Sequence, residues 1–239
     1  MNIAIIGYGK MGKEIEKIAI ERNHNISLII DKHNTGELTV ENLKNVDVAI
    51  EFTNKDVAIN NYYKCFEANV PVISGSTGIN KDEMAKIEKF VKENNQTFFW
   101  ASNFSLGVNI FFEINKYLAK LISKFDNYNA VITEIHHTQK LDSPSGTAIT
   151  IAEGIIENIP AYKSWINHET TNNNELEIIS RRIGDTPGTH IVNYNSEIDQ
   201  ITIKHEAFGR KGFALGAVLA GEYAVNKKGV LSMKDLLEI

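Results

Sequence analysis

The sequence predicts an α/β protein with an N-terminal Rossmann-type domain on a parallel sheet and a smaller central α+β domain with a mixed, largely antiparallel sheet. Three observations lead to this prediction. Up to about residue 105, short apolar runs alternate with helical stretches, as in βαβ units. The first run leads directly into a glycine-rich turn. Later runs are joined by short turns such as 184–188, and strands joined this closely are expected to pair mostly antiparallel.

Apolar periodicity places the individual elements. In the first region we expect strands at 2–6, 26–30, 46–52, 70–74 and 97–101, and helices near 10–22, 55–68 and 81–95. A long amphipathic helix is expected over 110–125. Its apolar residues at helical spacing are Ile114, Leu118, Leu121 and Phe125. The second region is expected to form strands at 128–137, 176–183, 190–195 and 198–206, helices near 147–158 and 212–226, and a polar surface loop at 167–175.

Composition excludes several classes of protein. Of 239 residues, 43% are hydrophobic and 23% charged, which is ordinary globular usage and argues against a disordered or fibrous chain. The net charge of −5 comes without a basic cluster, so no nucleic-acid partner is expected. No apolar run reaches the roughly 18 residues of a membrane span, and no signal peptide is recognisable. With the single cysteine Cys65, we expect a soluble cytoplasmic protein without a membrane partner.

A GxGxxG motif formed by Gly7, Gly9 and Gly12 follows the first apolar run and opens a helix. Gly7 permits the tight turn, Gly9 lets the backbone approach a pyrophosphate, and Gly12 lets the helix pack closely on the sheet. Asp31 stands 19 residues after Gly12, where a carboxylate accepts hydrogen bonds from the adenine ribose. A βα turn without a ligand is the alternative, and the spacing favours a dinucleotide. Asp31 favours NADH, whereas the neighbouring Lys32 can meet the 2′-phosphate of NADPH, so both cofactors are expected.

Two later loops are expected near the nicotinamide end of the cofactor, because they follow strands of the same sheet. They are 75–78 and 102–105, and ordinary loop chemistry is an equal alternative for both. The expected cofactor-binding residues are Gly7, Tyr8, Gly9, Lys10, Met11, Gly12, Asp31, Lys32, Gly75, Ser76, Thr77, Ser102, Asn103, Phe104 and Ser105.

Polar groups concentrate in the segment 134–148, between a strand and a helix. His136 and His137 should face opposite ways along the strand, and a histidine is a natural proton donor near neutral pH. Lys140 adds a cation, and 145–147 begin a helix, where an anion binds readily. Each residue also has an interpretation without a functional role. His136 and His137 could be core or surface residues, Lys140 could be a solvated loop charge, and Ser145 or Thr147 could simply cap the helix. Their concentration within twelve residues favours a functional site.

A zinc site is the other interpretation of the histidines. It would combine His136 and His137 with His190 or His205. Adjacent histidines at a strand end diverge, and no cysteine or acidic residue has a supporting spacing. No metal is therefore expected.

The chain resembles the 4-hydroxy-tetrahydrodipicolinate reductase family, also called dihydrodipicolinate reductases, of bacterial lysine and diaminopimelate biosynthesis. The resemblance rests on the glycine loop, on residues 102–109, and on the Glu-x-His-His-x-x-Lys-x-Asp-x-Pro-Ser-Gly-Thr-Ala string at 134–148. It extends to 181–190 and 205–236, which is essentially the whole chain. The long string is far more specific than GxGxxG.

The resemblance implies hydride transfer from NADH or NADPH to a small cyclic dicarboxylate, giving tetrahydrodipicolinate, by a homotetramer. It implies that residues 1–106, completed by 213–239, form a dinucleotide-binding domain, and that 107–212 form a substrate-binding and tetramerisation domain. Carried over by motif, His136 is the proton donor and acceptor and Lys140 the second proton donor. The implied substrate-binding residues are His137, Ser145, Gly146 and Thr147.

The chain departs from the usual pattern of the family in three ways. It is shorter after Asp31, Ser76 replaces a more usual threonine, and lysines stand at 10 and 32 where many members have arginine. These departures leave the cofactor preference open. A non-catalytic NAD(P)-sensing regulator is a second hypothesis, but it would need an interaction segment and no His136 or Lys140. A third, another amino-acid-pathway dehydrogenase such as one acting on aspartate, is disfavoured by the string at 134–148.

Overall fold

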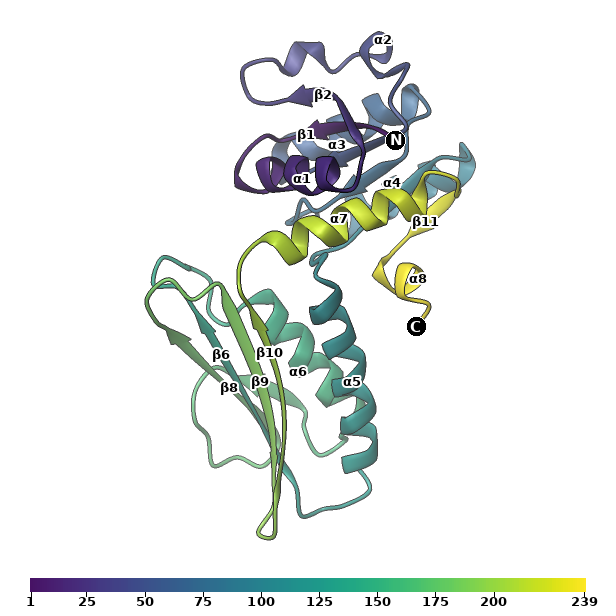
Figure 1. Ribbon diagram of the computed structural model, residues 1–239. Helices are drawn as coiled ribbons and strands as arrows, with labels where there is room; N and C mark the ends of the chain where they lie inside the picture. Colours follow the sequence, from purple (N-terminus) through teal and green to yellow (C-terminus); the bar gives the residue numbers. More distant parts are fainter. The chain divides into compact units, whose positions relative to one another are not determined.

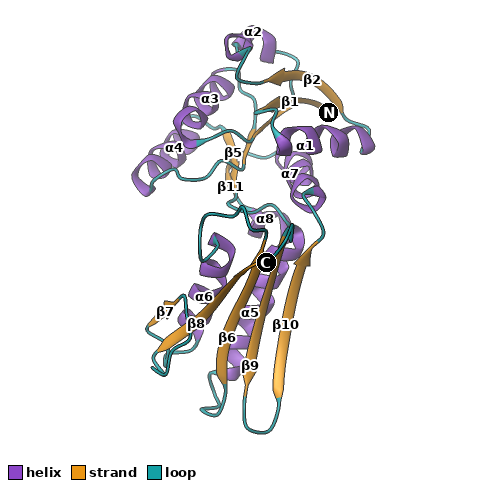
Figure 2. Cartoon of the chain, turned by 90° about the vertical axis from the view of Figure 1, so that its left-hand side faces the viewer, coloured by secondary structure: helices purple, strands orange, loops and turns teal.

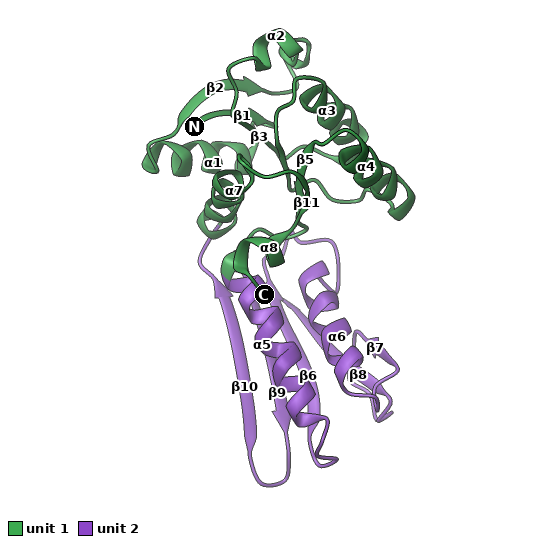
Figure 3. Ribbon diagram, turned by 90° about the vertical axis from the view of Figure 1, so that its right-hand side faces the viewer, with its two compact units in different colours: residues 1–106, 210–239 green, residues 107–209 purple.

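The computed structural model describes residues 1–239, which form two compact units (Figure 3). The first unit comprises 1–106 and 210–239, and the second comprises 107–209. The chain therefore leaves the first unit, builds the second and returns to complete the first, as the purple and yellow ends of the ribbon show (Figure 1).

The first unit is built on a six-stranded parallel sheet with the strand order β11-β5-β4-β3-β1-β2. Its strands are β1 (Asn2–Ile6), β2 (Asn25–Ile30), β3 (Val48–Glu51), β4 (Val72–Ser74), β5 (Thr97–Trp100) and β11 (Gly229–Leu231). Its helices are α1 (Lys10–Glu21), α2 (Val40–Leu43), α3 (Lys55–Glu67), α4 (Lys81–Glu93), α7 (Lys211–Ala224) and α8 (Met233–Leu237), with a 3-10 turn at Thr35–Glu37.

Helices cover both faces of this sheet. Its strands are therefore buried on both sides, which explains their continuous apolar sequences. Ile3 and Ile5 of β1 pack with α1 and α7 in one core, and Ala4 and Ile6 pack with α3 and α4 in the other. Successive residues of a strand point to opposite faces, so most residues of such a strand are apolar, and the polar Glu51 and Ser74 stand only at strand ends. The parallel Rossmann-type sheet predicted from the sequence is confirmed.

The second unit is a five-stranded mixed sheet with the order β10-β9-β6-β8-β7. Its strands are β6 (Asn129–His136), β7 (Ser164–Ile166), β8 (Glu175–Arg182), β9 (Gly188–Asn195) and β10 (Gln200–Ala207). Helices α5 (Leu106–Ile122) and α6 (Gly146–Asn158) cover one face, behind the sheet in Figure 2. Alternate strand residues face this helical layer, among them Ile132, Ile178 and Val192.

The mixed sheet confirms the predicted fold class, but the reasoning from short connections is wrong for β8. This strand pairs in parallel with β6 and with β7, whereas β6 with β9 and β9 with β10 pair antiparallel. The reason is that α6 connects β6 to the far side of the sheet, and a strand reached through a helical crossover returns parallel. Strands β8 and β9 are joined by a short turn, yet β6 lies between them.

The long helix is the other correction. It runs from Leu106 to Ile122 rather than over 110–125. Ile114, Leu121 and Phe125, which suggested it, are largely exposed. The buried face consists instead of Val108, Phe111, Asn115, Ala119 and Ile122. An apolar stripe therefore predicted the helix but indicated the wrong face.

Four short elements, α2, α8, β7 and β11, were not predicted, because three to five residues are too few to show a period. Residues 167–174 connect β7 to β8 without regular structure, close to the expected loop. None of the helices combines the length and apolar character needed to cross a membrane.

The contact between α7 and the loop before α5 gives a stability prediction. A Cβ at Gly216 would lie 1.7 Å from the backbone oxygen of Phe104, whereas a Cβ at Gly221 of the same helix would meet Val48 at an ordinary 3.5 Å. We expect Gly216→Ala to lower the free energy of unfolding by about 1–3 kcal/mol, despite the better helix propensity of alanine. Gly221→Ala is the matched control and should be neutral or slightly stabilising in urea denaturation. Equal effects of the two substitutions would contradict this packing.

Candidate active site

A cavity of about 450 Å³ lies in the first unit, at the carboxyl ends of β1, β2 and β3. It is lined by residues that follow these three strands: Ile6, Gly7, Tyr8, Gly9, Ile30, Asp31, Lys32, His33, Thr35, Thr53, Asn54, Val57 and Asn61. In open α/β sheets, ligands bind at the carboxyl ends of the strands. Five of the residues predicted to bind the cofactor are among them: Gly7, Tyr8, Gly9, Asp31 and Lys32.

The three glycines of the turn differ in their surroundings. Gly7 has a φ of +97°, and a Cβ there would lie 2.2 Å from the backbone oxygen of Phe52. A Cβ at Gly12 would lie 2.2 Å from the oxygen of Gly7, so this glycine lets α1 approach the strand end. Gly9 faces open space and begins α1 without a side-chain cap. The start of α1 can therefore meet a pyrophosphate with backbone N–H groups.

The loop after β2 is held in a defined conformation. The backbone N–H of His33 donates to Asp31 Oδ1 at 2.7 Å, and the backbone N–H of Asp31 donates to Asn34 Oδ1 at 2.7 Å. Asp31 is half-buried and Lys32 is exposed, and both line the cavity. A carboxylate and an ammonium group therefore stand side by side where the adenine ribose of a dinucleotide is expected.

The loops predicted to reach the nicotinamide do not line this cavity. Ser76 is buried, and its hydroxyl donates to Glu51 Oε1 at 3.1 Å. Phe104 is also buried, and its ring stacks on Phe99 with the centroids 5.8 Å apart. Ser102 and Thr77 are exposed. The side chains of Ser76 and Phe104 thus serve the interior of the first unit, and the Ser76 backbone does so too, because its N–H donates to Ser74 Oγ and its oxygen accepts from Trp100.

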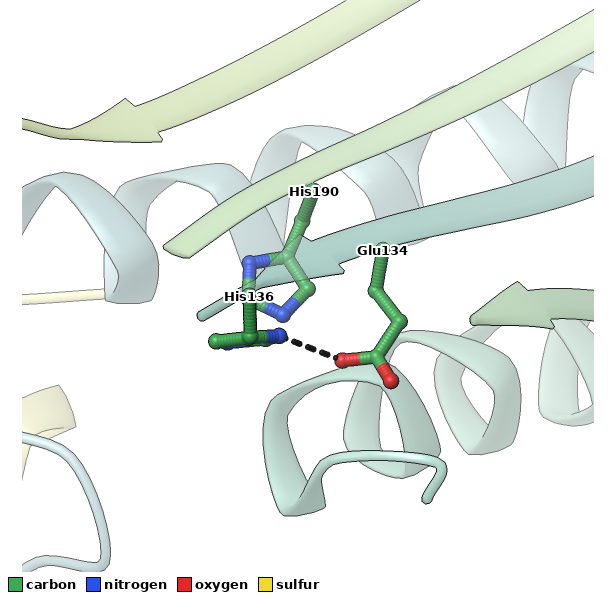
Figure 4. Close-up of side chains that lie close together, drawn as sticks. All are labelled: Glu134, His136 and His190. Atoms are coloured by element: carbon green, nitrogen blue, oxygen red, sulfur yellow. Dashed lines mark ion pairs between the residues drawn. The ribbon is translucent and has the colours of Figure 1, made fainter. Parts of the chain in front are cut away.

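In the second unit, a buried glutamate and a buried histidine lie close together at the end of β6. Glu134 Oε2 is 2.8 Å from His136 Nδ1, and the Glu134 side chain is fully buried (Figure 4). Its other oxygen accepts from the Ser145 backbone N–H at 3.3 Å and from Arg182 Nη2 at 3.0 Å. Burial opposes ionisation, but hydrogen bonds from His136, Ser145, Ser180 and Arg182 outweigh it and lower the pKa of Glu134. The carboxylate is therefore ionised beside the imidazole.

A second histidine, His190 of β9, joins this pair. Register places it opposite Glu134, and its ring lies edge-on to that of His136 with the centroids 5.1 Å apart. Its Nε2 is 3.2 Å from Ser145 Oγ, which also accepts from the Ala148 backbone N–H as the N-cap of α6. Burial and the charge of His136 lower the pKa of His190 to about 3, so it stays neutral.

Lys140 lies in the loop after β6, in an ion pair with Asp142 at 2.7 Å. Arg182 donates to the backbone oxygen of Asp142 at 2.6 Å and to Glu134, so it ties this loop to the buried pair. Burial raises the pKa of Asp142, but the hydrogen bond from Lys140 outweighs it and lowers that pKa. The Asp142 carboxylate is therefore ionised beside Lys140.

The remaining predicted substrate residues lie at the strand end and at the start of α6. His136 is buried and His137 half-buried, in keeping with the alternation along β6. Gly146 is exposed, with open space where a Cβ would stand, and Thr147 is half-buried. Ser145 is buried as the helix cap, so both its N–H and its hydroxyl serve the protein itself.

Glu134, His136 and His190 also form a group with metal-ligating atoms, all within 4.8 Å of one another. This set differs from the zinc site weighed from the sequence, because it includes an acid and omits His137. The guanidinium of Arg182 already neutralises the carboxylate and would repel a divalent cation. The donor set therefore favours proton transfer over metal binding.

From the sequence, no role was assigned to Glu134 or Arg182, and His190 was considered only as a zinc ligand. A signal for Glu134 was present, because residues two apart on a strand share a face. Arg182 and His190 come from β8 and β9, and only the register of the sheet brings them to the end of β6. No pattern in a single sequence gives that register.

A glycine turn that opens onto a cavity at the ends of parallel strands, together with a buried acid–base pair in a second unit, defines a class of protein: the dinucleotide-dependent oxidoreductases. Two family models match this chain, "Dihydrodipicolinate reductase, N-terminus" over residues 1–104 and "Dihydrodipicolinate reductase, C-terminus" over 107–237. The chain belongs to the dihydrodipicolinate reductase family. It is an NAD(P)H-dependent oxidoreductase, and its N-terminal unit is the dinucleotide-binding one.

Relatives cover the full length of the chain. A 4-hydroxy-tetrahydrodipicolinate reductase of Christiangramia forsetii is 45% identical, over 99% of this chain and 98% of that protein. One from Thermosipho africanus is 32% identical, over 100% and 98%. Among solved structures, the dipicolinate-bound dihydrodipicolinate reductase from Paenisporosarcina sp. TG-14 has a TM-score of 0.78 at 22% identity, and covers 98% of each chain. At that identity the structural match supports the fold.

The depressed pKa of His190 gives a prediction on stability. An unfolded histidine titrates near pH 6.5, so below that pH the unfolded chain binds a proton that the folded protein excludes until about pH 3. This part of the stability is complete above pH 6.5 and is lost as the pH falls, by up to about 1.4 kcal/mol per pH unit. We expect His190→Gln to flatten the dependence of the unfolding free energy between pH 6.5 and 5, measured by urea denaturation.

The control for His190→Gln is His168→Gln, which replaces an exposed histidine of the same unit. It should leave the wild-type slope unchanged. A wild-type slope in His190→Gln would show that His190 is not held neutral by burial.

Proposed function

We propose that this protein reduces 4-hydroxy-tetrahydrodipicolinate to tetrahydrodipicolinate with NADH or NADPH, in diaminopimelate and lysine biosynthesis. The observation that carries the proposal is the buried Glu134–His136 pair, which lies in the string at 134–148 that is specific to the family. The reductases named above, one of them 45% identical over 99% of the chain, support the assignment of the substrate.

His136 and Lys140 are proposed as the proton-transferring residues. When bound, the dinucleotide would supply a hydride, and the 4-hydroxyl group of the substrate would leave as water, so the reaction takes up one hydride and, in net, one proton. His136 is suited to deliver it, because Glu134 lies 2.8 Å from Nδ1 and stabilises the protonated ring. Lys140 supplies a second proton and a positive charge near the developing anion.

The carboxylates of the substrate are proposed to bind at the start of α6, at Gly146 and Thr147, and beside His137. A helix N-terminus attracts anions through its N–H groups and dipole. Lys140 is paired with Asp142 here, so it would exchange that partner for a substrate carboxylate. Ser145 contributes by positioning, since its polar atoms already bind Glu134, Ala148 and His190.

Cofactor-binding roles are proposed for both sets of loops in the first unit. The residues that line the cavity would hold the adenosine and pyrophosphate. The loops at 75–77 and 102–105 would meet the nicotinamide through the exposed Thr77 and Ser102. A sensing regulator would need the cavity as well, but it would have no use for a buried acid–base pair in the second unit.

We also propose a homotetramer and a cytoplasmic location. Helices cover one face of the second sheet, and the other face carries the half-buried Val131, Ile135, Ile179 and Ile191. Polar residues such as Asn193, Thr202 and Lys204 share this face, and a face that mixes apolar and polar groups suits a contact with another subunit. We expect light scattering to give a mass near four times 26.8 kDa. A monomer mass that does not change with concentration would contradict the tetramer.

A coupled assay tests the reaction itself. The purified protein is mixed with the synthase that makes the unstable substrate, and oxidation of NADH and of NADPH is followed separately. Oxidation that depends on the synthase product supports the proposal. A protein that binds NADH but oxidises neither cofactor with that product would overturn it.

Substitutions in the second unit should separate chemistry from binding. His136→Gln is expected to lower kcat by about 10²–10⁴-fold, with the affinity for NADH unchanged. Lys140→Met should lower kcat and raise KM for the dicarboxylate together, and Thr147→Val should act mainly on that KM. His168→Gln, at an exposed site, is the control for a histidine replacement. Near-normal kcat in a folded His136→Gln protein would remove the proton-transfer role.

Lys32 is expected to recognise the 2′-phosphate of NADPH, because it lines the cavity beside Asp31. Lys32→Ala should weaken NADPH binding by about tenfold and leave NADH binding nearly unchanged, measured by fluorescence titration. Lys44→Ala, which removes an exposed lysine paired with Glu41, controls for the loss of one charge. Equal losses for both cofactors would show that Lys32 does not contact the phosphate.

A further inference from the structure

Glu51, the last residue of β3, is a fully buried carboxylate that the proposed reaction does not use. It forms no ion pair with a lysine, arginine or histidine, although a buried charge is costly unless it is compensated. Compensation comes instead from a set of N–H and O–H donors on the two loops that follow β3 and β4.

Oxygens of Glu51 accept four hydrogen bonds. Oε1 accepts from the backbone N–H of Thr53 at 3.1 Å, from the Thr53 hydroxyl, and from the Ser76 hydroxyl at 3.1 Å. Oε2 accepts from the Ser74 hydroxyl at 2.9 Å. The Thr53 N–H also reaches Ser76 Oγ at 3.0 Å, so the two loops contact each other directly as well as through the carboxylate.

A second layer of bonds orients these donors. The Tyr62 hydroxyl lies 2.6 Å from Ser74 Oγ, and burial and the charge of Glu51 raise the pKa of Tyr62, so the phenol keeps its proton and donates. The Ser76 backbone N–H also donates to Ser74 Oγ, at 3.2 Å. Ser74 Oγ therefore accepts two bonds, and its own proton points to Glu51. Trp100 at the end of β5 donates to the Ser76 backbone oxygen at 3.0 Å, which adds a third strand end.

This network borders the cavity of the first unit. Thr53 lines the cavity, and its neighbour Asn54 does too. The backbone oxygen of Phe52 and the Thr53 methyl group also form the surface against which the Gly7 turn packs, since a Cβ at Gly7 would lie 2.2 and 2.9 Å from them. A shift of the loop after β3 would therefore move one wall of the cavity and the support of the glycine turn together.

We infer that Glu51 is a positioning residue for dinucleotide binding, which acts through Thr53 and Ser76 by holding the loops after β3 and β4 in the conformation that the cofactor meets. The inference rests on the proposed assignment of the cavity to the dinucleotide. A carboxylate suits this role because its two oxygens accept hydrogen bonds, and the four contacts around them all come from donors. A glutamine of the same shape would direct two N–H donors at one of these groups.

The test compares Glu51→Gln with a matched substitution, Thr97→Val. Thr97 is buried in the same sheet, at the amino end of β5, and its hydroxyl donates to the Lys227 backbone oxygen. Both substitutions keep the shape of the side chain and disrupt buried hydrogen bonding. Glu51 contacts the loops after β3 and β4, whereas the hydroxyl of Thr97 donates only to Lys227. Dissociation constants for NADH are measured by fluorescence titration, Tm by calorimetry, and kcat and both KM values by the coupled assay.

We expect Glu51→Gln to weaken NADH binding about tenfold and to raise KM for NADH, with KM for the dicarboxylate and kcat at saturating NADH within about threefold of wild type. Thr97→Val should lower Tm and leave NADH binding unchanged. Wild-type NADH affinity in folded Glu51→Gln, or equal weakening by both substitutions, would overturn the inference.

Two other results are possible: the wild-type protein binds no cofactor, or Glu51→Gln does not fold. If the wild-type protein binds neither NADH nor NADPH, the proposed function fails and the inference fails with it. If Glu51→Gln does not fold, Ser74→Ala takes its place, because it removes one donor to Glu51 and leaves every residue of the cavity in place. Ser74→Ala should weaken NADH binding in the same direction, and unchanged binding would again overturn the inference.

Discussion

The buried carboxylate of Glu134 is the constraint on which the proposed active site depends. A carboxylate in this position destabilises the fold unless donors surround it, and three arrive from different elements: His136 on β6, Arg182 on β8 and the Ser145 N–H at the start of α6. The same bonds that compensate the charge fix the imidazole, the start of the helix and, through Arg182 and Asp142, the loop that carries Lys140. The same contacts thus stabilise the fold and hold the residues that we propose for proton transfer.

The two units solve the problem of a buried acid in different ways. In the second unit Glu134 is neutralised by cationic or protonatable groups, which suits a site where a proton moves. In the first unit Glu51 is held by hydroxyl groups and a backbone N–H alone, which suits a role in keeping two loops in place. Both acids stand at or near the carboxyl end of a strand, where polar side chains can meet without breaking the sheet.

Local patterns predicted what depends on local sequence. Runs buried on both faces gave the parallel sheet, and the glycine spacing gave the turn that leads to the cavity. The string at 134–148 led to the prediction that His136 and Lys140 transfer protons, which stays a prediction. Contacts that depend on how strands pair could not be predicted. Arg182 reaches Glu134 because β8 pairs with β6, and His190 reaches it because β9 pairs with β6 on the other side. Glu51 was missed because a glutamate at the end of an apolar run shows no sign that hydroxyls from distant loops surround it.

The most direct test of this account is the turnover of Glu134→Gln, compared with Glu177→Gln. Glu177 lies on the neighbouring strand and accepts from the Thr170 backbone N–H, away from His136. We expect kcat of folded Glu134→Gln to fall by about 10²-fold or more, with the dissociation constant for NADH unchanged, because the imidazole loses the group that orients it and stabilises its charge. Glu177→Gln should keep wild-type kcat. A folded Glu134→Gln protein that turns over at the wild-type rate would contradict the central role given to this carboxylate.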